Sequence, residues 1–426
     1  MKEYILDLHI HSKYSRACSS RLELPLIAET CKIRGIDIVA TGDFTHPRWF
    51  SHMKEQLLEV GDGLYGVKNL STKFLIATEV ACIKKHKGKT RRIHLLLFAP
   101  TLGVAEKFNN VLSQRGFNIR SDGRPILGIT SKDLLSLMLE TDERMVVIPA
   151  HAWTPWFGIF GSKGGYDSLD DAFEELSSYV RAIETGLSSD PLMNWYISAL
   201  DDITLISNSD AHSPQKLGRE ANVMQFSESH MSYDEIMRVI QKKDKENFLY
   251  TIEFYPEEGK YHNDGHRDCK FSCSAIETKN KYKGICPVCK RSLTIGVDYR
   301  VHELADRSVE DVQKIRDTQI PYKSLVPLPE IIGDSIGKGV ATKSVQHIYE
   351  MMIEHIGSEF FILLHADLKQ VEDVAGQVIA DALDRVRRGD IFIRPGYDGE
   401  FGVVKVFPED SDIRPGQIGF DIETQL

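Results

Sequence analysis

Histidine and acidic residues follow several short apolar runs in the first half of this 426-residue chain. Directly after the first run come Asp7, His9 and His11. Alternate side chains of a strand point to the same face, so these three would share one side of a sheet. A His-x-His pair alone is a weak signal, because histidines are common on protein surfaces, but the pattern recurs along the chain.

Histidine, aspartate or glutamate also lies at or near the end of each later apolar run. The residues concerned are Asp43, His46, Glu79, His94, His151, Glu184, Asp210 and His212. The run from Phe74 to Thr78, for example, predicts a strand with Glu79 at its tip. Strands that alternate with helices over residues 1–230 predict a parallel sheet, and in a closed parallel barrel the strand ends converge on one face. We therefore expect one polar cluster, although any single residue is as readily explained as a turn or capping group.

Such a cluster suits metal-dependent chemistry. Imidazole and carboxylate groups are ligands for zinc, manganese or iron, and a mixed set does not select among them. Two or three such ions close together activate water at neutral pH and neutralise the attacking and leaving oxygens at phosphorus. The cluster therefore predicts phosphoester hydrolysis. Asp7 is either a carboxylate that orients a ligand histidine or an ordinary acid at the end of a strand.

The ordered motifs resemble the polymerase and histidinol phosphatase (PHP) family. They are Asp7-Leu8-His9-Ile10-His11, Thr41-Gly42-Asp43, Glu79, His94, Pro149-Ala150-His151 and Ser209-Asp210-Ala211-His212. The resemblance implies a distorted seven-stranded β/α barrel with two or three divalent ions, drawn from zinc, manganese, magnesium and iron. It implies a catalytic centre in which one ion is held by His9, His11, Glu79 and Asp210. A second ion would be held by Glu79, His94 and His151.

A third ion would be held by His212 together with Asp43 or His46. The chain departs from the common family pattern here, since Ala17 stands where many members have a histidine. It also has Gly42-Asp43-Phe44 where many members have Thr-Asp-His. The third site is therefore either absent or built from a different set of ligands.

The loop after the predicted ligand His151 is rich in aromatic residues and glycines. Aromatic side chains beside a phosphoesterase centre can stack on a nucleobase, which is worth about 1–3 kcal/mol per base. Aromatic residues also dominate protein cores, so rings that cap the barrel core are an equally good explanation. The candidate DNA or base contacts beside predicted ligands are Trp49, Trp153, Trp156, Phe157 and Lys163.

Four of the seven cysteines lie close together as two pairs, which is typical of a structural zinc module. They are Cys269, Cys273, Cys286 and Cys289. Residues 260–300 carry nine Lys and Arg against four Asp and Glu, in a chain whose formal net charge is −10. A zinc module with a local basic excess can bind a phosphate backbone, although a solvated surface explains the charge equally well.

The rest of the chain predicts a third, mainly helical domain. Gly337-Lys338-Gly339 precedes a helical run and is similar to a phosphate clamp at a helix N-terminus, which makes Lys338 a candidate DNA contact. A simple glycine turn is at least as good an explanation. We divide the chain into a metal-dependent phosphoesterase domain (1–250), a four-cysteine zinc module (251–300) and a C-terminal helical DNA-binding domain (301–426).

Taken together, the three parts resemble the endonuclease Q family of PHP-domain enzymes. The resemblance implies a DNA repair endonuclease that cuts the phosphodiester 5′ of deaminated bases (hypoxanthine, uracil and xanthine) and of abasic sites, with the base flipped into a pocket. It implies a monomer with one structural zinc and DNA as its partner. It also implies binding to the sliding clamp through a C-terminal peptide, of which 417–420 and 425–426 carry fragments.

Composition sets the broad class and leaves two alternatives. Apolar residues make up 42% of the chain and charged residues 27%, as in an ordinary soluble protein. We find neither a run of eighteen apolar residues nor a signal-peptide pattern, so we expect a cytoplasmic protein with no membrane partner, associated with the nucleoid of a prokaryote. The alternatives are a small-molecule phosphatase of the PHP type and a DNA-binding protein whose PHP domain is only structural.

Overall fold

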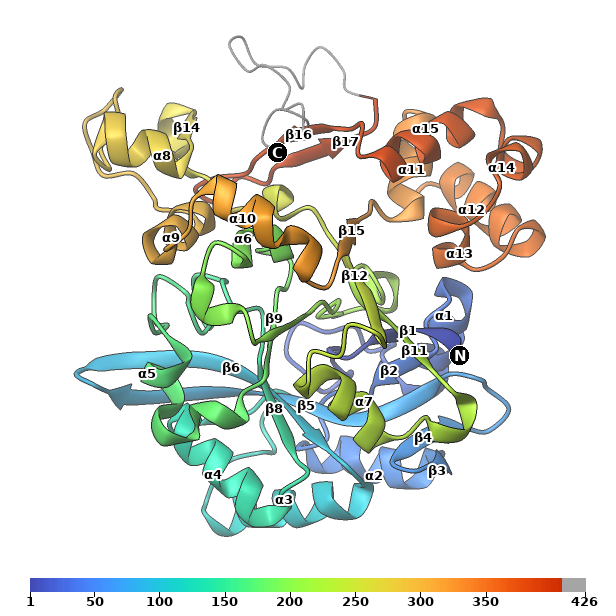
Figure 1. The fold of residues 1–426 in the computed structure, drawn as a ribbon. Coiled ribbons are helices and arrows are strands. Elements are labelled where there is room, and N and C mark those ends of the chain that lie inside the picture. Colours follow the sequence, from blue (N-terminus) through green and yellow to red (C-terminus); the bar gives the residue numbers. More distant parts are fainter. Residues whose placement is uncertain (408–426) are drawn as a thin grey trace.

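The computed structural model describes residues 1–407. A large mixed sheet with helices packed around it forms the main body, and two smaller lobes lie at one end of this body (Figure 1). One lobe is built around residues 264–304 and the other from residues 328–388. The fragments of a clamp-binding peptide at 417–420 and 425–426 lie outside the described residues.

The central sheet is mixed, with parallel and antiparallel neighbours. Its strands are β1 (Lys2–Asp7), β2 (Ile38–Ala40), β3 (Leu57–Gly61), β4 (Leu64–Val67), β5 (Lys73–His86), β6 (Lys89–Ala99), β7 (Ile126–Leu127), β8 (Val146–Pro149), β11 (Ala221–Phe226), β12 (Phe248–Glu253) and β15 (Tyr322–Ser324). As predicted, β1, β2 and β5 run parallel. However, β6 is antiparallel to both β5 and β8, and β11 is antiparallel to β1. A separate parallel pair is formed by β9 (Ala182–Glu184) and β10 (Thr204–Ile206).

The prediction of a parallel sheet therefore holds only in part, and one reason lies between β5 and β6. Lys87 and Gly88 have φ values of 48° and 80°, the backbone of a tight two-residue hairpin turn. No helix separates the two strands, so they pair antiparallel. In addition, β5 is fourteen residues long, which places Glu79 in the middle of a strand and not at its tip.

Helices pack around this sheet, and α1 shows how the sequence specifies them. The helices of the main body are α1 (Leu24–Arg34), α2 (Pro47–Gln56), α3 (Leu102–Gln114), α4 (Ser131–Thr141), α5 (Leu169–Phe173), α6 (Pro191–Asn194) and α7 (Tyr233–Gln241). In α1, Ile27, Ala28 and Cys31 are buried on one face. Gly35 ends the helix in the left-handed conformation, with φ 87°, and a side chain there would collide with Ser358.

The lobe around residues 264–304 is small and has an apolar cluster of its own. Its elements are β13 (Asp264–His266), β14 (Phe271–Cys273), α8 (Ala275–Glu277) and α9 (Val297–Leu304), followed by α10 (Val309–Ile315). The buried members of the cluster are Cys273, Cys286 and Leu293. So small a cluster stabilises a fold only weakly, which is the usual reason for a structural metal in a module of this size.

The C-terminal lobe is mainly helical, as predicted. It contains α11 (Leu328–Ser335), α12 (Lys343–His355), α13 (Glu359–Leu364), α14 (Leu368–Ala375) and α15 (Gln377–Arg388), and the antiparallel hairpin β16 (Phe392–Arg394) and β17 (Val403–Lys405) follows it. Arg34 of α1 forms a buried ion pair with Glu359, 3.0 Å long, which attaches the lobe to the main body.

We predicted domain boundaries at residues 250 and 300. However, β12, which spans the first boundary, pairs with β15, which lies beyond the second. The sheet of the main body therefore continues past the module that interrupts it in sequence. Within residues 1–407 we find no helix with the length and apolar character that crossing a membrane requires.

Candidate active site

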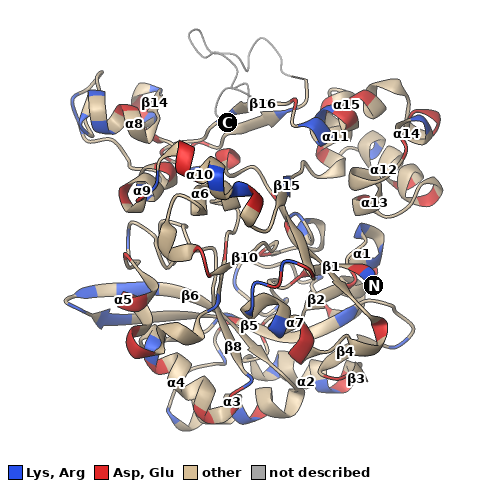
Figure 2. Cartoon of the chain, viewed as in Figure 1, with Lys and Arg blue, Asp and Glu red and all other residues tan. Residues whose placement is uncertain are grey.

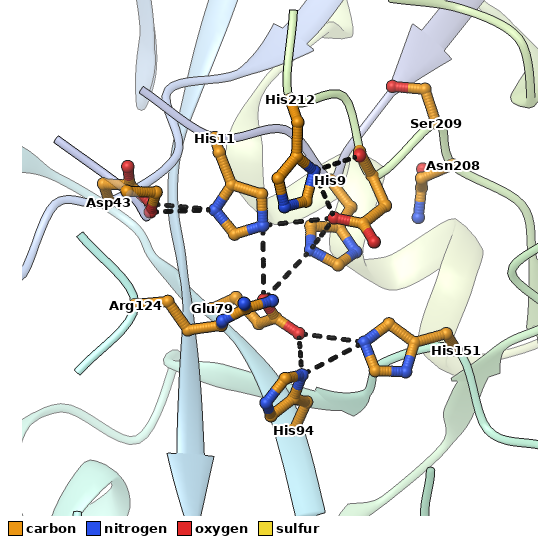
Figure 3. A network of polar contacts seen from close by, with 12 residues as sticks. His9, His11, Asp43, Glu79, His94, Arg124, His151, Asn208, Ser209 and His212 are labelled. Atoms are coloured by element: carbon orange, nitrogen blue, oxygen red, sulfur yellow. Dashed lines mark hydrogen bonds and ion pairs between the residues drawn. The ribbon is translucent and has the colours of Figure 1, made fainter. Parts of the chain in front are cut away.

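Six residues predicted as ligands converge on one side of the main body. His9 and His11 follow β1, Glu79 lies within β5, His94 lies within β6, His151 follows β8 and Asp210 follows β10. The backbone N–H of His11 donates to the carbonyl of Ala211 at 3.1 Å, which fastens the segment after β1 to the segment after β10. The six residues form two groups that have one member in common (Figure 3).

The first group consists of His9, His11, Glu79 and Asp210, whose ligand atoms all lie within 4.8 Å of one another. Nε2 of His11 lies 3.3 Å from Oε2 of Glu79 and 3.1 Å from Oδ1 of Asp210. Nε2 of His9 lies 3.6 Å and 3.5 Å from the same two oxygens. Two imidazole nitrogens and two carboxylate oxygens thus face a common centre.

The second group consists of Glu79, His94 and His151. Oε1 of Glu79 lies 2.7 Å from Nδ1 of His94 and 3.0 Å from Nε2 of His151. Because Oε2 faces the first group and Oε1 faces the second, this buried carboxylate has the placement of a bridging ligand between two metal ions (Figure 3).

The nitrogen atoms of His9 fit a metal ion in the first group. Nε2 is buried and has no hydrogen-bond partner, although buried polar atoms normally have one. Nδ1 lies 3.0 Å from both carboxylate oxygens of Glu184, so the proton belongs on Nδ1 and the lone pair of Nε2 faces the group. A set of imidazole and carboxylate ligands suits a divalent transition-metal ion.

Glu184, at the end of β9, is a functional residue whose role the sequence did not reveal. Besides His9, it accepts the backbone N–H of His151 at 2.7 Å and the side-chain amide of Asn208 at 2.8 Å. It thereby orients a ligand of the first group and fixes the backbone of a ligand of the second. Its position at a strand end was visible in the sequence, but its contact with His9 depends on the tertiary structure.

Asp43 has a comparable role toward His11. Its Oδ1 lies 3.1 Å from Nδ1 of His11, and its Oδ2 accepts the backbone N–H and the hydroxyl of Ser12 at 2.7 Å and 2.6 Å. Both oxygens are therefore engaged in orienting the segment after β1. We predicted Asp43 as a metal ligand, and the structure places it beside one.

The residues expected to hold a third ion, His212 with Asp43 or His46, lie outside the two ligand groups. The ring of His46 stacks on Tyr14, with centroids 4.5 Å apart, and Nδ1 of His212 lies 2.8 Å from the carbonyl oxygen of Asp210. Among residues 1–407, none of these three residues belongs to a group of three or more candidate ligands whose ligand atoms all lie within 4.8 Å of one another. The departures from the PHP pattern noted in the sequence fall at this same place.

Asp7 connects two backbone segments. Its oxygens accept the backbone N–H groups of Ser209 and Gly218 at 3.0 Å and 2.9 Å. Burial raises the pKa of Asp7 to about 6, against the opposing effect of these hydrogen bonds. Of the two roles considered for Asp7, the structure favours the carboxylate at a strand end that holds the chain in place.

Unusual backbone conformations are found at three residues of the site. Asp43, His151 and Asp210 have φ values of 47°, 31° and 46°. The left-handed region costs a residue with a side chain about 1–2 kcal/mol. Such conformations persist where surrounding contacts enforce them, and they concentrate at functional sites.

Burial and nearby charges set the protonation of the second group. Burial alone would raise the pKa of Glu79, but His94 and Arg124 hold it well below its usual range. Burial lowers the pKa of His94 to about 4, whereas the contact with Glu79 raises the pKa of His151 against the effect of burial.

Arg124, which precedes β7, is part of the site and was missing from our predictions. Its Nη1 lies 2.9 Å from Oε2 of Glu79, and its side chain is 26% exposed (Figure 3). One arginine among many carries no recognisable signal in the sequence, because only the contact with Glu79 distinguishes it.

Two of the aromatic residues proposed to contact a base belong to the core. Trp49 and Trp153 are each 1% exposed. Their indole N–H groups donate to the carbonyl of Gly42 at 2.9 Å and to the side chain of Asn194 at 2.8 Å. The prediction that these two tryptophans contact DNA is therefore wrong, and the alternative explanation, that they fill the core, is correct.

The other two aromatic residues of the loop reach the surface or the site. Trp156 is 43% exposed and packs edge-on against Tyr261, with centroids 5.4 Å apart. Phe157 stacks on the ring of His94 at 4.2 Å. Lys163 is exposed on the same loop.

Lys338 is exposed at the end of α11. Its backbone N–H donates to the carbonyl of Gly333 at 2.9 Å, so this group completes the end of α11 and is not available to a phosphate. The structure therefore favours the simple glycine turn over the proposed clamp.

In the small lobe, the ligand atoms within 4.8 Å of one another come from His266, Cys269, Cys286 and Cys289. Cys273, expected as the fourth ligand, lies outside this group, and its Sγ is 3.2 Å from the hydroxyl of Thr278. The pairing of β13 with β14 explains the exchange, because it sets Cys273 opposite Asp264, at the far end of the hairpin from His266. Three thiolates and one imidazole are a set typical of structural zinc. We name these four residues the Cys/His module.

Comparisons with known proteins cover both the C-terminal lobe and the whole chain. Residues 327–390 match the family model described as the MJ0043 C-terminal domain. Over 279 residues, or 64% of this chain, the sequence is 33% identical to the uncharacterized protein MJ0043 of Methanocaldococcus jannaschii, and this match spans 34% of the length of that protein.

Two solved structures are similar over nearly their full length. One is the crystal structure of the lesion-specific endonuclease PfuEndoQ from Pyrococcus furiosus, with a TM-score of 0.84, 30% identity and 99% of both chains covered. The other is endonuclease Q in complex with a 27-mer duplex that has an abasic lesion at the active site. Its TM-score is 0.81 and its identity 31%, with 96% of this chain and 98% of that chain covered. Because the similarity includes the main body and both lobes, the chain belongs to the endonuclease Q family.

Proposed function

We propose that this protein is a metal-dependent DNA repair endonuclease that cuts the phosphodiester 5′ of a damaged nucleotide. The lesions would be abasic sites and the deaminated bases hypoxanthine, uracil and xanthine. The observation that carries the proposal is the position of Glu79, whose two oxygens each face one buried group of ligands. Family membership supports DNA as the substrate, since a member of the family has been seen with a lesion-containing duplex at its active site.

Two divalent ions fit the donor atoms of the site. The ligands would be His9, His11, Glu79 and Asp210 for one ion, and Glu79, His94 and His151 for the other. When bound, zinc, manganese, magnesium or iron in such a pair activates water and neutralises charge at phosphorus. The protein holds the ligands in place beforehand: Glu184 and Asp43 fix the rings of His9 and His11, so that both Nε2 atoms face the first group.

We also propose that the main body is a distorted seven-stranded barrel of the PHP type, completed by β9 and β10. Two backbone contacts support closure. The N–H of Ala152, after β8, donates to the carbonyl of Glu184 in β9 at 2.9 Å, and Ile10 forms a bridge with Ala211 after β10. A barrel would explain why ligands distant in sequence meet on one face.

DNA contacts are proposed on the loop that follows His151 and on the small lobe. Trp156, which is exposed, and Phe157, whose ring lies against that of His94, would stack on an unpaired base. The small lobe carries a local excess of basic residues, with Lys and Arg segments near α8 (Figure 2). One zinc ion held by the Cys/His module would keep this lobe folded, and the protein would act as a monomer on one lesion at a time.

A nicking assay with end-labelled duplexes tests the proposal. The duplexes carry one deoxyinosine, one deoxyuridine, one abasic site or no lesion, and the protein is supplied with manganese, magnesium or zinc after chelation. We expect a cut 5′ of each lesion that His9→Ala abolishes and His230→Ala leaves intact, because His230 is exposed and lies outside the ligand groups.

Two other results would assign a different function. Intact DNA together with phosphate released from small phosphoesters would identify a phosphatase. Duplex binding without hydrolysis under any metal condition would identify a DNA-binding protein whose metal site is structural.

A further inference from the structure

Arg124 places a permanent positive charge next to the predicted metal ligand Glu79. Its guanidinium donates to Oε2 of Glu79 at 2.9 Å, the oxygen that faces the first group. The Glu79 side chain is fully buried, whereas the Arg124 side chain is 26% exposed. The partly exposed guanidinium therefore contacts the buried carboxylate shared by the two groups, and Figure 3 shows Arg124 beside Glu79.

The backbone that carries Arg124 is held from two directions. Oδ1 of Asp122 accepts the backbone N–H of Arg124 at 3.0 Å and that of Arg16 at 3.2 Å. On the other side, the carbonyl of Pro125 accepts the N–H of Ala81 in β5 at 3.0 Å. The arginine thus starts from a fixed point between the loop after β1 and the strand that carries Glu79.

Gly123 brings this loop close to the residues that orient the first group. A side chain at Gly123 would collide with the carboxylate of Asp43 and the hydroxyl of Ser15. The N–H of Gly123 also donates to the carbonyl of Tyr14 at 3.0 Å. The absence of a Cβ at this position therefore permits the approach that brings Arg124 to the site.

The charge of Arg124 can attract an anion once metal ions take up the charge of Glu79. A carboxylate shared by two divalent ions is neutralised by them, and Asp210 would be neutralised in the same way. A guanidinium beside those ions then keeps the attraction of Asp122 and gains from a further anion. The anion that must reach this site is the phosphodiester of the substrate. A guanidinium has N–H donors in the planar geometry that phosphate oxygens accept.

We propose that Arg124 is a catalytic residue that donates hydrogen bonds to a non-bridging oxygen of the scissile phosphate. This inference rests on the proposed nuclease function. The guanidinium supplies positive charge beside the oxygen of Glu79 that faces the first group. A donor aimed at charge that develops in the transition state contributes to the rate more than to the binding of the duplex.

The test compares Arg124→Met and Arg124→Lys with a control from the same loop, Arg120→Met, whose side chain is exposed. For each protein we would measure bound metal, the affinity of the metal-loaded protein for a duplex without a lesion, and the single-turnover nicking rate on an abasic-site duplex. We expect Arg124→Met to keep the full metal content and to bind the duplex within about threefold of the wild type. Its nicking rate should fall about 10²–10³-fold, as for other lost transition-state donors. Arg124→Lys should recover part of this loss, and Arg120→Met should match the wild type.

A phosphorothioate at the scissile position locates the contact. Replacing the oxygen that Arg124 binds with sulfur should slow the wild type and have a smaller effect on Arg124→Met, because the contact is already lost. The inference is overturned if Arg124→Met nicks at the wild-type rate, or if it loses metal in proportion to activity. The second result would make Arg124 a counter-ion that only balances Glu79. If the wild type itself fails to nick, the proposed function fails, and this outcome is distinct from both.

Discussion

The molecule builds two kinds of metal-binding group, and they differ in how far apart their ligands lie in the sequence. The active-site groups take ligands from residues 9 to 210 on separate strands, whereas the Cys/His module takes all four from residues 266 to 289. Five of the six active-site residues are buried, Asp210 is half-buried, and the two groups share the carboxylate of Glu79. In the module, Cys269 and Cys289 are half-buried, and the ligands lie on short turns and one hairpin.

This difference indicates which group performs chemistry. Three thiolates and an imidazole complete the tetrahedral coordination of zinc and leave no position for water or substrate. The second active-site group contains only three residues, one of which, Glu79, also belongs to the first group, and Arg124 adds a charge that a purely structural site does not need. The active-site ligands are brought together by contacts between distant parts of the sequence, whereas the ligands of the Cys/His module are brought together by local turns.

The strongest test of this contrast is Glu79→Gln, which removes the shared negative charge but keeps the shape of the side chain. We expect nicking to fall by about 10³-fold or more, since both ions lose a ligand at once. The module should keep its zinc, because its ligands are independent of β5. Metal analysis alongside the nicking assay checks both points, and loss of the zinc from the module would contradict the separation of the two sites.

The second test concerns the identity of the fourth module ligand. His266→Ala should weaken zinc binding by about 3 kcal/mol, roughly a quarter of the binding free energy of a structural zinc site. Cys273→Ser should leave zinc in place, since its Sγ lies outside the group. Competition with a chromophoric chelator measures both. If Cys273→Ser weakened zinc binding more than His266→Ala did, the ligands would be the four cysteines expected from the sequence.

A smaller effect is expected at Glu184, which touches ligands of both active-site groups without belonging to either. Glu184→Gln should reduce metal affinity or nicking by about 10–100-fold, the usual cost of removing a group that orients a ligand histidine. Isothermal titration with manganese, with the exposed Glu29→Gln as control, provides the measurement. Equal affinities in the two variants would show that His9 needs no orienting carboxylate.

The smallest effect concerns stability and distinguishes the buried main body from the more exposed module. Burial raises the pKa of Glu253 to about 8, and the pKa of its buried neighbour Glu220 is also raised. The folded state therefore keeps a proton that the unfolded chain releases above a pH of about 4.3. The contribution of Glu253 to the free energy of unfolding should thus decline as pH rises from about 4.3 to 8.

Glu253→Gln should flatten this decline and raise stability at pH 8 by on the order of 1 kcal/mol. Thr185 and Ser207, whose hydroxyls donate to Glu253, can rotate to accommodate the amide. Urea unfolding of the metal-loaded protein at pH 5.5 and pH 8 measures the change. An identical pH slope in the variant and the wild type would rule out this titration.

Residue type and strand position marked out a set of candidate side chains, and the resemblance to the PHP family singled out the six that the structure brings together in two groups. Each lies in an apolar run or just after one, and period-two alternation sends His9 and His11 to the same face. The order of these motifs also identified the family. The tryptophans show the limit of the method, because an aromatic residue beside a ligand has the same sequence pattern whether it faces solvent, as Trp156 does, or the core, as Trp153 does.

The tertiary structure alone decided which polar side chains touch the ligands. The contacts of Glu184 with His9, of Arg124 with Glu79 and of His266 with the cysteines join segments whose pairing depends on strand direction and hairpin register. A local pattern specifies a strand and its faces, because these follow from the backbone geometry of a few residues. It does not specify which strands become neighbours, since that depends on the packing of the whole core.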